Sequence, residues 1–176
     1  MLLNKIESEK IIDLLKKKIK NPKTSLKYRN RFTLLISVVL SAQSTDVNVN
    51  NITKNIYKKY YRPKHFVNLG INKIKNLIKS IGLFNNKAKN IYNLSKILIK
   101  KYKSRIPRTF DELIQLPGVG RKTANVVLNE AFNKATVAVD THVFRVSNRT
   151  GLTHGKNPTE VEEQLLKNLQ REESTK

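Results

Sequence analysis

The stretch Leu116-Pro117-Gly118-Val119-Gly120-Arg121-Lys122-Thr123-Ala124 (LPGVGRKTA) lies between two segments whose apolar residues recur at helical spacing. Glycines at 118 and 120 allow left-handed or otherwise strained backbone and let an anion approach the main chain closely. The helix that follows offers unpaired N–H groups and the positive end of its dipole. The stretch therefore predicts a hairpin that grips phosphates, and such contacts position DNA without reading its sequence.

The flanking residues define the extent of this hairpin. Thr109 and Glu112 form a capping box, which predicts a short helix from Phe110 to about Gln115, and a second helix continues to Ala131. The helix-hairpin-helix thus spans about 110–131. Val119, at the tip, either anchors the turn or touches a sugar, and we favour the anchor; the DNA-binding candidates here are Gly118, Val119, Gly120, Arg121 and Thr123.

Lys122 is the candidate nucleophile. It falls in the first turn of the second helix, where a cation opposes the helix dipole. The same position lowers the cost of losing the proton, so an amine there is more easily converted into a nucleophile. The alternative is that Lys122 is a second phosphate contact beside Arg121.

Asp140 is the natural partner of that lysine. The helix from Lys122 to Ala131 would advance about 14 Å, and residues 133–140 could span up to roughly 26 Å if extended, so the chain can return to its starting point. Asp140 (or Thr141) also caps the next helix, and a capping carboxylate is held fixed and ionised.

The rest of the pattern predicts an all-α protein. Phe32 to Ala42 (FTLLISVVLSA) is apolar nearly all round and reads as the core helix, and Asp46 is placed to cap the helix after it. Gly70, Gly82 and Pro107 interrupt the middle of the chain. We expect two lobes, a central helical lobe at 25–133 and a second lobe made of 1–24 and 134–176.

The composition favours an anionic partner. The net charge of +22 concentrates phosphate around a protein and points to nucleic acid. Part of that charge can instead reflect the Lys, Asn and Ile supplied by A/T-rich codons. The chain has no cysteine, which excludes disulfides and zinc-thiolate sites, and His65, His142 and His154 follow no metal-binding pattern, so we expect no metal.

With these residues in view, the chain resembles the endonuclease III family from about Phe32 to Leu166. Leu116 to Ala124 resembles the family's helix-hairpin-helix with its catalytic lysine at Lys122, and Val139 to Val146 (VDTHVFRV) resembles the segment with its catalytic aspartate at Asp140. Leu40 to Asp46 (LSAQSTD) and Ile81 to Asn85 (IGLFN) resemble two further signatures.

The resemblance implies a helix-hairpin-helix DNA glycosylase fold, with two lobes flanking a DNA-binding groove, and a base-excision-repair glycosylase with AP lyase activity. Lys122 would attack the flipped nucleotide, expel an oxidised pyrimidine and nick the strand through a Schiff base and β-elimination, with Asp140 assisting. Gln43 and Leu83 would fill the gap left in the duplex. From the sequence alone, Leu83 can also be a core leucine and Gln43 a plain helix end.

The sequence departs from the family pattern at its C-terminus. Family members commonly continue with further helices and a four-cysteine iron-sulfur loop, so we expect no 4Fe-4S cluster and an incomplete second lobe. A reduced but working enzyme, a decaying gene product and an incomplete sequence stay open.

Two other functions compete with the glycosylase and lyase. One is a non-catalytic or degenerate helix-hairpin-helix DNA-binding protein. The other is an adenine DNA glycosylase, against which the acid-free helix ISVVLSAQ argues. The expected partner is double-stranded DNA with a damaged base or an abasic site. No apolar stretch suits a membrane, and we expect a monomer in the cytoplasm, associated with the nucleoid.

Overall fold

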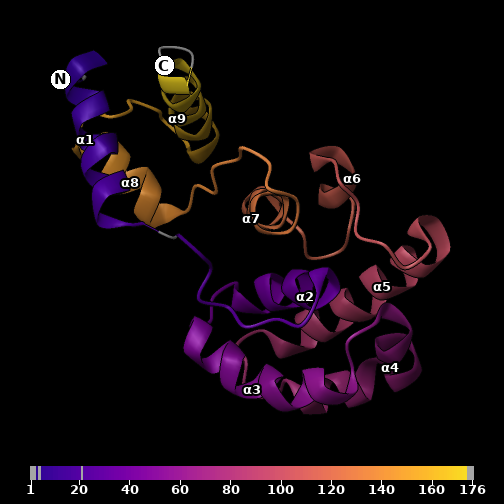
Figure 1. Ribbon diagram of the computed structural model, residues 1–176. Helices are drawn as coiled ribbons and strands as arrows, with labels where there is room; N and C mark the ends of the chain where they lie inside the picture. The colour runs from indigo at the N-terminus through magenta and orange to yellow at the C-terminus, as the bar shows by residue number, and fades with distance from the viewer. Residues whose placement is uncertain (1–2, 4, 21, 174–176) are drawn as a thin grey trace. The chain divides into compact units, whose positions relative to one another are not determined.

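The computed structural model describes residues 3, 5–20 and 22–173, and every regular element within them is a helix (Figure 1). The helices are α1 Lys5–Lys18, α2 Arg31–Ser41, α3 Asp46–Lys59, α4 Pro63–Leu77, α5 Phe84–Tyr102, α6 Phe110–Ile114, α7 Arg121–Phe132, α8 Thr141–Arg149 and α9 Pro158–Glu173. The expected all-α class is confirmed. None of the described helices combines the length and the apolar character needed to cross a bilayer.

The chain divides into two compact units. One is the continuous segment Thr24–Lys134, and the other joins Met1–Lys23 to Ala135–Lys176. The sequence-based boundaries stand at residues 25 and 133, next to these. Each unit is described below by itself.

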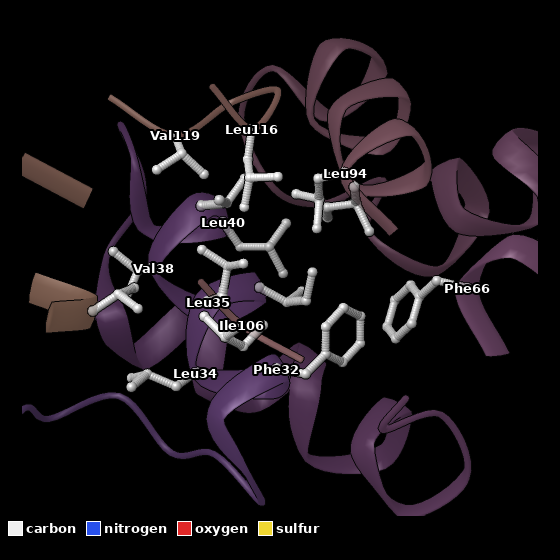
Figure 2. Close-up of a cluster of buried hydrophobic side chains, with 14 of the residues drawn as sticks. Phe32, Leu34, Leu35, Val38, Leu40, Phe66, Leu94, Ile106, Leu116 and Val119 are labelled. Atoms are coloured by element: carbon white, nitrogen blue, oxygen red, sulfur yellow. The ribbon is translucent and has the colours of Figure 1, made fainter. Parts of the chain in front are cut away.

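Helix α2 is the centre of the larger unit, as its all-round apolar sequence predicts. Its residues from Phe32 to Leu40 are all buried, and it packs against α3, α5 and α7. Phe32 meets Phe66 of α4 edge to face with ring centroids 5.5 Å apart (Figure 2). A helix that is apolar on every side must be surrounded by others, and the short α2 therefore fixes where its neighbours lie.

Local signals set most helix ends. Asn30 caps α2 and forms a capping box with Thr33, and Thr109 caps α6, whose Glu112 N–H it accepts. The cap of α3 corrects the sequence prediction: Thr45, not Asp46, accepts the N–H of Asn48. Asp46 is the first helical residue, and its carboxylate accepts a hydrogen bond from the hydroxyl of Ser25.

Glycine interrupts α4 as expected. Gly70 has φ 71° and breaks the helix into two segments. The segment before it, which starts at Pro63, was not predicted as a helix, although proline suits the first position of one.

In the smaller unit α8 and α9 pack together, and the N–H of Leu3 donates to the carbonyl of Gly151 over 3.0 Å. Among the side chains of this unit whose burial is described, the buried apolar ones are Val139 and Val161. Ile6 and Leu14 of α1 remain 64% and 60% exposed, so much of the apolar face of this helix is open to solvent.

Candidate nucleic-acid interface and catalytic residues

The hairpin between α6 and α7 depends on one left-handed glycine. Gly118 has φ 79°, and a Cβ placed there would lie 2.9 Å from the side-chain nitrogen of Asn90. Backbone N–H groups of Leu116 and Val119 donate to the carbonyls of Leu113 and Leu116, each over 3.0 Å. The turn is therefore closed by its own backbone and leaves no room for a side chain at 118.

Gly120 serves a different purpose, which corrects the expectation that both glycines relieve strain. Its φ of −93° and ψ of −179° are open to any residue, and a Cβ there would meet no atom within 4 Å. It is the N-cap of α7 and provides no side chain to cap the helix. The space above the first turn of α7 is thus kept clear, as the approach of a phosphate would require.

Val119 anchors the hairpin. Its side chain is only 6% exposed and belongs to the same core cluster as Leu116. Figure 2 shows both side chains directed into the cluster that contains Leu40 of α2. The side chain of Val119 therefore holds the tip to the core, and it is the least suited of the predicted DNA contacts to touch a sugar.

The basic pair lies on the outside of the hairpin. Arg121 and Lys122 are the first two residues of α7 and both are exposed, whereas Thr123 is half-buried. The guanidinium of Arg121 lies 5.0 Å from the ring centre of Phe110, the first residue of α6. Two cations thus stand where the positive end of a helix dipole already favours an anion.

Asp140 belongs to the smaller unit and is the N-cap of α8. Its half-buried carboxylate accepts the N–H of Val143 over 2.9 Å. Of the two expected capping residues, Asp140 is therefore the one that caps. The bond fixes one carboxylate oxygen at the start of a helix.

Gln43 and Leu83 come from separate turns that meet. Both residues have left-handed backbone, with φ 53° and 59°, and both side chains are exposed, Leu83 by 56%. A Cβ on Gly82 would lie 3.3 Å from the carbonyl oxygen of Gln43, so the two turns are in contact. Leu83 is not a core residue, and Gln43 directly follows Ala42, the C-cap of α2.

Lys87 is the functional candidate that the sequence analysis missed. Its buried ammonium donates to the carbonyls of Leu40 and Ala42 over 2.9 and 2.5 Å, and burial lowers its pKa. It therefore satisfies the C-terminal carbonyls of α2 immediately before Gln43. The sequence signal that could have identified Lys87 is its spacing, because Phe84, Lys87 and Ile91 share one face of α5.

A hydrogen bond on the other side also secures this pair of turns. The side-chain nitrogen Nδ2 of Asn48, in the first turn of α3, donates to the carbonyl of Ser80 over 3.3 Å. The turn before α3 and the turn before α5 are therefore joined by a side chain as well as by the contact at Gly82. Gln43 and Leu83 are therefore exposed on two turns that these contacts fix to each other.

The all-helical fold, the glycine hairpin and the exposed basic pair define a class, the helix-hairpin-helix proteins of base excision repair. The family model of the HhH-GPD superfamily of base excision DNA repair proteins matches residues 36–171. An endonuclease III of Rickettsia conorii is 56% identical over 89% of this chain and 75% of its own length. That of Escherichia coli is 47% identical over 94% of this chain and 78% of its own.

A solved structure agrees with these relatives. A trapped endonuclease III-DNA covalent intermediate, in an estranged-adenine complex, superposes with a TM-score of 0.90 at 46% identity and covers 94% of this chain and 78% of that one. The chain therefore belongs to the endonuclease III family. The predicted class, a base-excision-repair DNA glycosylase with AP lyase activity, is confirmed, and neither the non-catalytic alternative nor the adenine glycosylase is favoured.

Proposed function

We propose that this protein removes oxidised pyrimidines from double-stranded DNA and cleaves the strand at the resulting or pre-existing abasic site, with Lys122 as the nucleophile. The observation that carries the proposal is an exposed amine in the first turn of α7, directly after a turn that only glycine fits. A relative that is 46% identical has been trapped in a covalent complex with DNA.

The reaction requires one nucleophilic amine and one group that accepts protons. The neutral amine of Lys122 attacks C1′ of the flipped nucleotide, the bond from C1′ to the base breaks, and the base leaves with the electron pair and takes up a proton. The sugar ring opens to a protonated Schiff base. Loss of a proton from C2′ then expels the 3′ phosphate, and hydrolysis returns the lysine.

Asp140 is proposed to stabilise the positive charge that develops on the sugar and to assist the proton transfers. The support is local. Its carboxylate is oriented by the N–H of Val143, so little orientational freedom remains to be lost in the transition state.

Gln43 and Leu83 are proposed to enter the duplex where the damaged nucleotide has left the stack. Flipping costs a few kcal/mol of stacking and pairing, and inserted side chains replace part of the lost contact. An exposed leucine and an exposed amide on two adjoining turns supply an apolar surface and hydrogen-bonding groups for that gap.

The proposed mechanism uses no cofactor. A four-cysteine iron-sulfur cluster does not fit these 176 residues, which contain no thiolate ligand. Among the described residues no three His, Asp or Glu side chains gather as a metal site would require. The lysine chemistry above needs neither group.

We further propose that the protein acts as a monomer in the cytoplasm, associated with the nucleoid. The hairpin and the Gln43 and Leu83 turns all belong to one chain, and a net charge of +22 favours residence on DNA.

Borohydride trapping tests the nucleophile. Full-length protein is incubated with a duplex that contains one abasic site or one oxidised thymine, and borohydride reduces any Schiff base to a covalent adduct. We expect an adduct with the parent protein and none with Lys122→Ala. Lys100→Ala, which removes an exposed lysine of α5, is the matched control and should trap normally. An undiminished adduct from Lys122→Ala would refute the assignment.

Asp140→Asn tests the carboxylate without removing the cap, because asparagine caps helices as well as aspartate does. We expect unchanged thermal stability and DNA affinity, with base release slowed by about tenfold to a thousandfold. Single-turnover release of oxidised thymine measures this. Release at the parental rate would show that the carboxylate has no part in the chemistry.

A further inference from the structure

A basic concavity lies in the larger unit, and its lining includes Glu112 of α6 but no residue from 113 to 131. It is a pocket of about 1210 Å³ formed where several core helices begin or end. Arg31 starts α2, Arg62 precedes α4, Tyr102 ends α5 and Phe132 ends α7, and the loop from Ser104 to Arg108 completes the wall.

This pocket is separate from the proposed DNA-contacting residues. Gln43 follows the last turn of α2, whereas Arg31 begins that helix, so about 16 Å of helix lies between them. Leu83 precedes α5 and Tyr102 ends it, a separation of roughly 28 Å along the axis. A ligand in the pocket therefore lies at the opposite ends of α2 and α5 from the gap-filling turns, and at the opposite end of α7 from Arg121, while Glu112 of α6 forms part of its wall.

The pocket is strongly positive and its charge is not neutralised from within. Five cations and one carboxylate give the lining a net formal charge of +4; they are Arg31, Arg62, Lys64, Arg105, Arg108 and Glu112. Glu112 accepts the hydroxyl of Thr109 over 2.7 Å. Within the part of the chain that the structure describes, no carboxylate pairs with any of the five cations.

Three of the four pocket arginines lie against aromatic rings. The guanidiniums of Arg31 and Arg108 lie 5.0 and 5.5 Å from the ring centre of Phe132, and that of Arg62 lies 5.5 Å from the ring centre of Tyr61. The Nε of Arg31 also donates to the carbonyl of Ala131 over 3.0 Å. Stacking fixes the planar groups in place and leaves their charge for a ligand.

Two further features favour an anion. Helices α2 and α4 both begin at the pocket, and the N-cap Arg62 of α4 makes no side-chain capping bond. The hydroxyl of Tyr102, on the pocket wall, is buried and has no hydrogen-bond partner in the described residues. A buried hydroxyl without a partner costs free energy, which a phosphate oxygen would recover if binding brought the two groups into contact.

We propose that this pocket binds a run of adjacent phosphate groups, either the triphosphate of a free nucleotide or the backbone of a second nucleic-acid strand. Guanidinium forks match phosphate oxygens, and the several cations around one cavity need more than one phosphate to balance them. The volume exceeds what a single phosphate fills.

Calorimetry with inorganic tripolyphosphate tests the proposal on the full chain at fixed ionic strength. The pocket variant combines Arg62→Gln, Arg105→Gln and Arg108→Gln. Its control combines Lys54→Gln, Lys73→Gln and Lys100→Gln, exposed residues outside the pocket that remove the same charge. We expect the pocket variant to bind about tenfold or more weakly, and the control to stay within about threefold of the parent. Equal losses in both variants would show general attraction to a basic protein and overturn the proposal.

Tyr102→Phe tests the proposal independently, in case the triple variant does not fold. It removes one hydroxyl and keeps the ring, and we expect tripolyphosphate binding to weaken severalfold with the thermal melt unchanged. Parental affinity in this variant, together with an unfolded triple variant, would overturn the proposal.

Competition identifies the source of the phosphates. A nucleoside triphosphate and an undamaged single-stranded oligonucleotide are each titrated against bound tripolyphosphate, and the one that displaces it through the pocket arginines is the ligand class. Displacement by neither counts against a nucleotide-type ligand and overturns the proposal. Borohydride trapping by the pocket variant should remain normal, which separates this site from the proposed catalytic one.

Discussion

Left-handed backbone without glycine marks the two turns that carry Gln43 and Leu83. An L-residue in this region costs roughly 1 to 2 kcal/mol, so surrounding contacts must hold each turn in place. Lys87 supplies such contacts by donating to the carbonyls of Leu40 and Ala42. Lys87 is therefore a positioning residue, because its buried ammonium holds the turn and the exposed Gln43 is the side chain proposed to enter DNA.

The pH dependence of stability should reveal this buried amine. Burial lowers the pKa of Lys87 below its usual value of about 10.4. Between the folded and the usual pKa, the unfolded chain holds a proton that the folded protein lacks, so stability rises with pH in that window. Lys87→Met should cost about 1 to 3 kcal/mol at pH 7, because two carbonyls lose their donor.

Urea denaturation of parent and Lys87→Met at several pH values up to about 10 checks the sign. The difference in unfolding free energy should widen in favour of the parent as the pH approaches the usual lysine pKa. Other titrating groups are common to both proteins and cancel. A difference that stays flat or narrows would contradict a lowered lysine pKa.

In the hairpin between α6 and α7, two glycines of one motif have different structural roles. Gly118 is required by both conformation and space, whereas Gly120 keeps a surface open. The spacing G-x-G does not distinguish the two, because φ at each position depends on how the turn packs on Asn90 and the core.

Substitution should separate these two roles. Gly118→Ala should destabilise the protein by about 1 to 3 kcal/mol, since it adds left-handed strain and a clash with Asn90. Gly120→Ser should leave stability unchanged or improve it, because serine is a good N-cap. The same serine should weaken DNA binding, since its side chain occupies the space left for a phosphate.

Chemical denaturation and binding to an abasic-site duplex measure these two effects. Parental DNA affinity in Gly120→Ser would show that no phosphate approaches this turn. A Gly118→Ala protein as stable as the parent would contradict the conformational requirement.

The net charge of +22 attracts the whole protein to DNA and makes binding depend on salt. Each phosphate neutralised by a cation releases condensed counterions, so affinity falls as salt rises. The exposed position of Arg121 beside the open start of α7 makes it one such cation.

Salt titration of duplex binding quantifies this contribution. We expect affinity for undamaged duplex to fall by roughly a hundredfold or more between 50 and 200 mM salt. Arg121→Gln should reduce the logarithmic slope by about 1. A parental slope in this variant would mean that Arg121 does not contact a phosphate.

Periodicity and local signals were sufficient for much of the fold. The all-round apolar run in α2, the capping box at Thr109 and the break at Gly70 all carry their information in a few neighbouring residues. The prediction that Asp46 caps α3 was wrong, because Thr45 is the cap. Asp46 is instead the acceptor of the hydroxyl of Ser25, a partner 21 positions away.

Spacing along the chain was enough to predict the helical class, the hairpin and the residue types of the candidate site. The packed structure was needed to show that Leu83 is exposed, that the favoured anchoring role of Val119 is correct and that Lys87 donates to the carbonyl of Ala42 before Gln43. Packing also brings together the pocket arginines, which come from the starts of α2 and α4 and from the loop before α6. Burial and proximity between distant segments are properties of packing, and no local pattern encodes them.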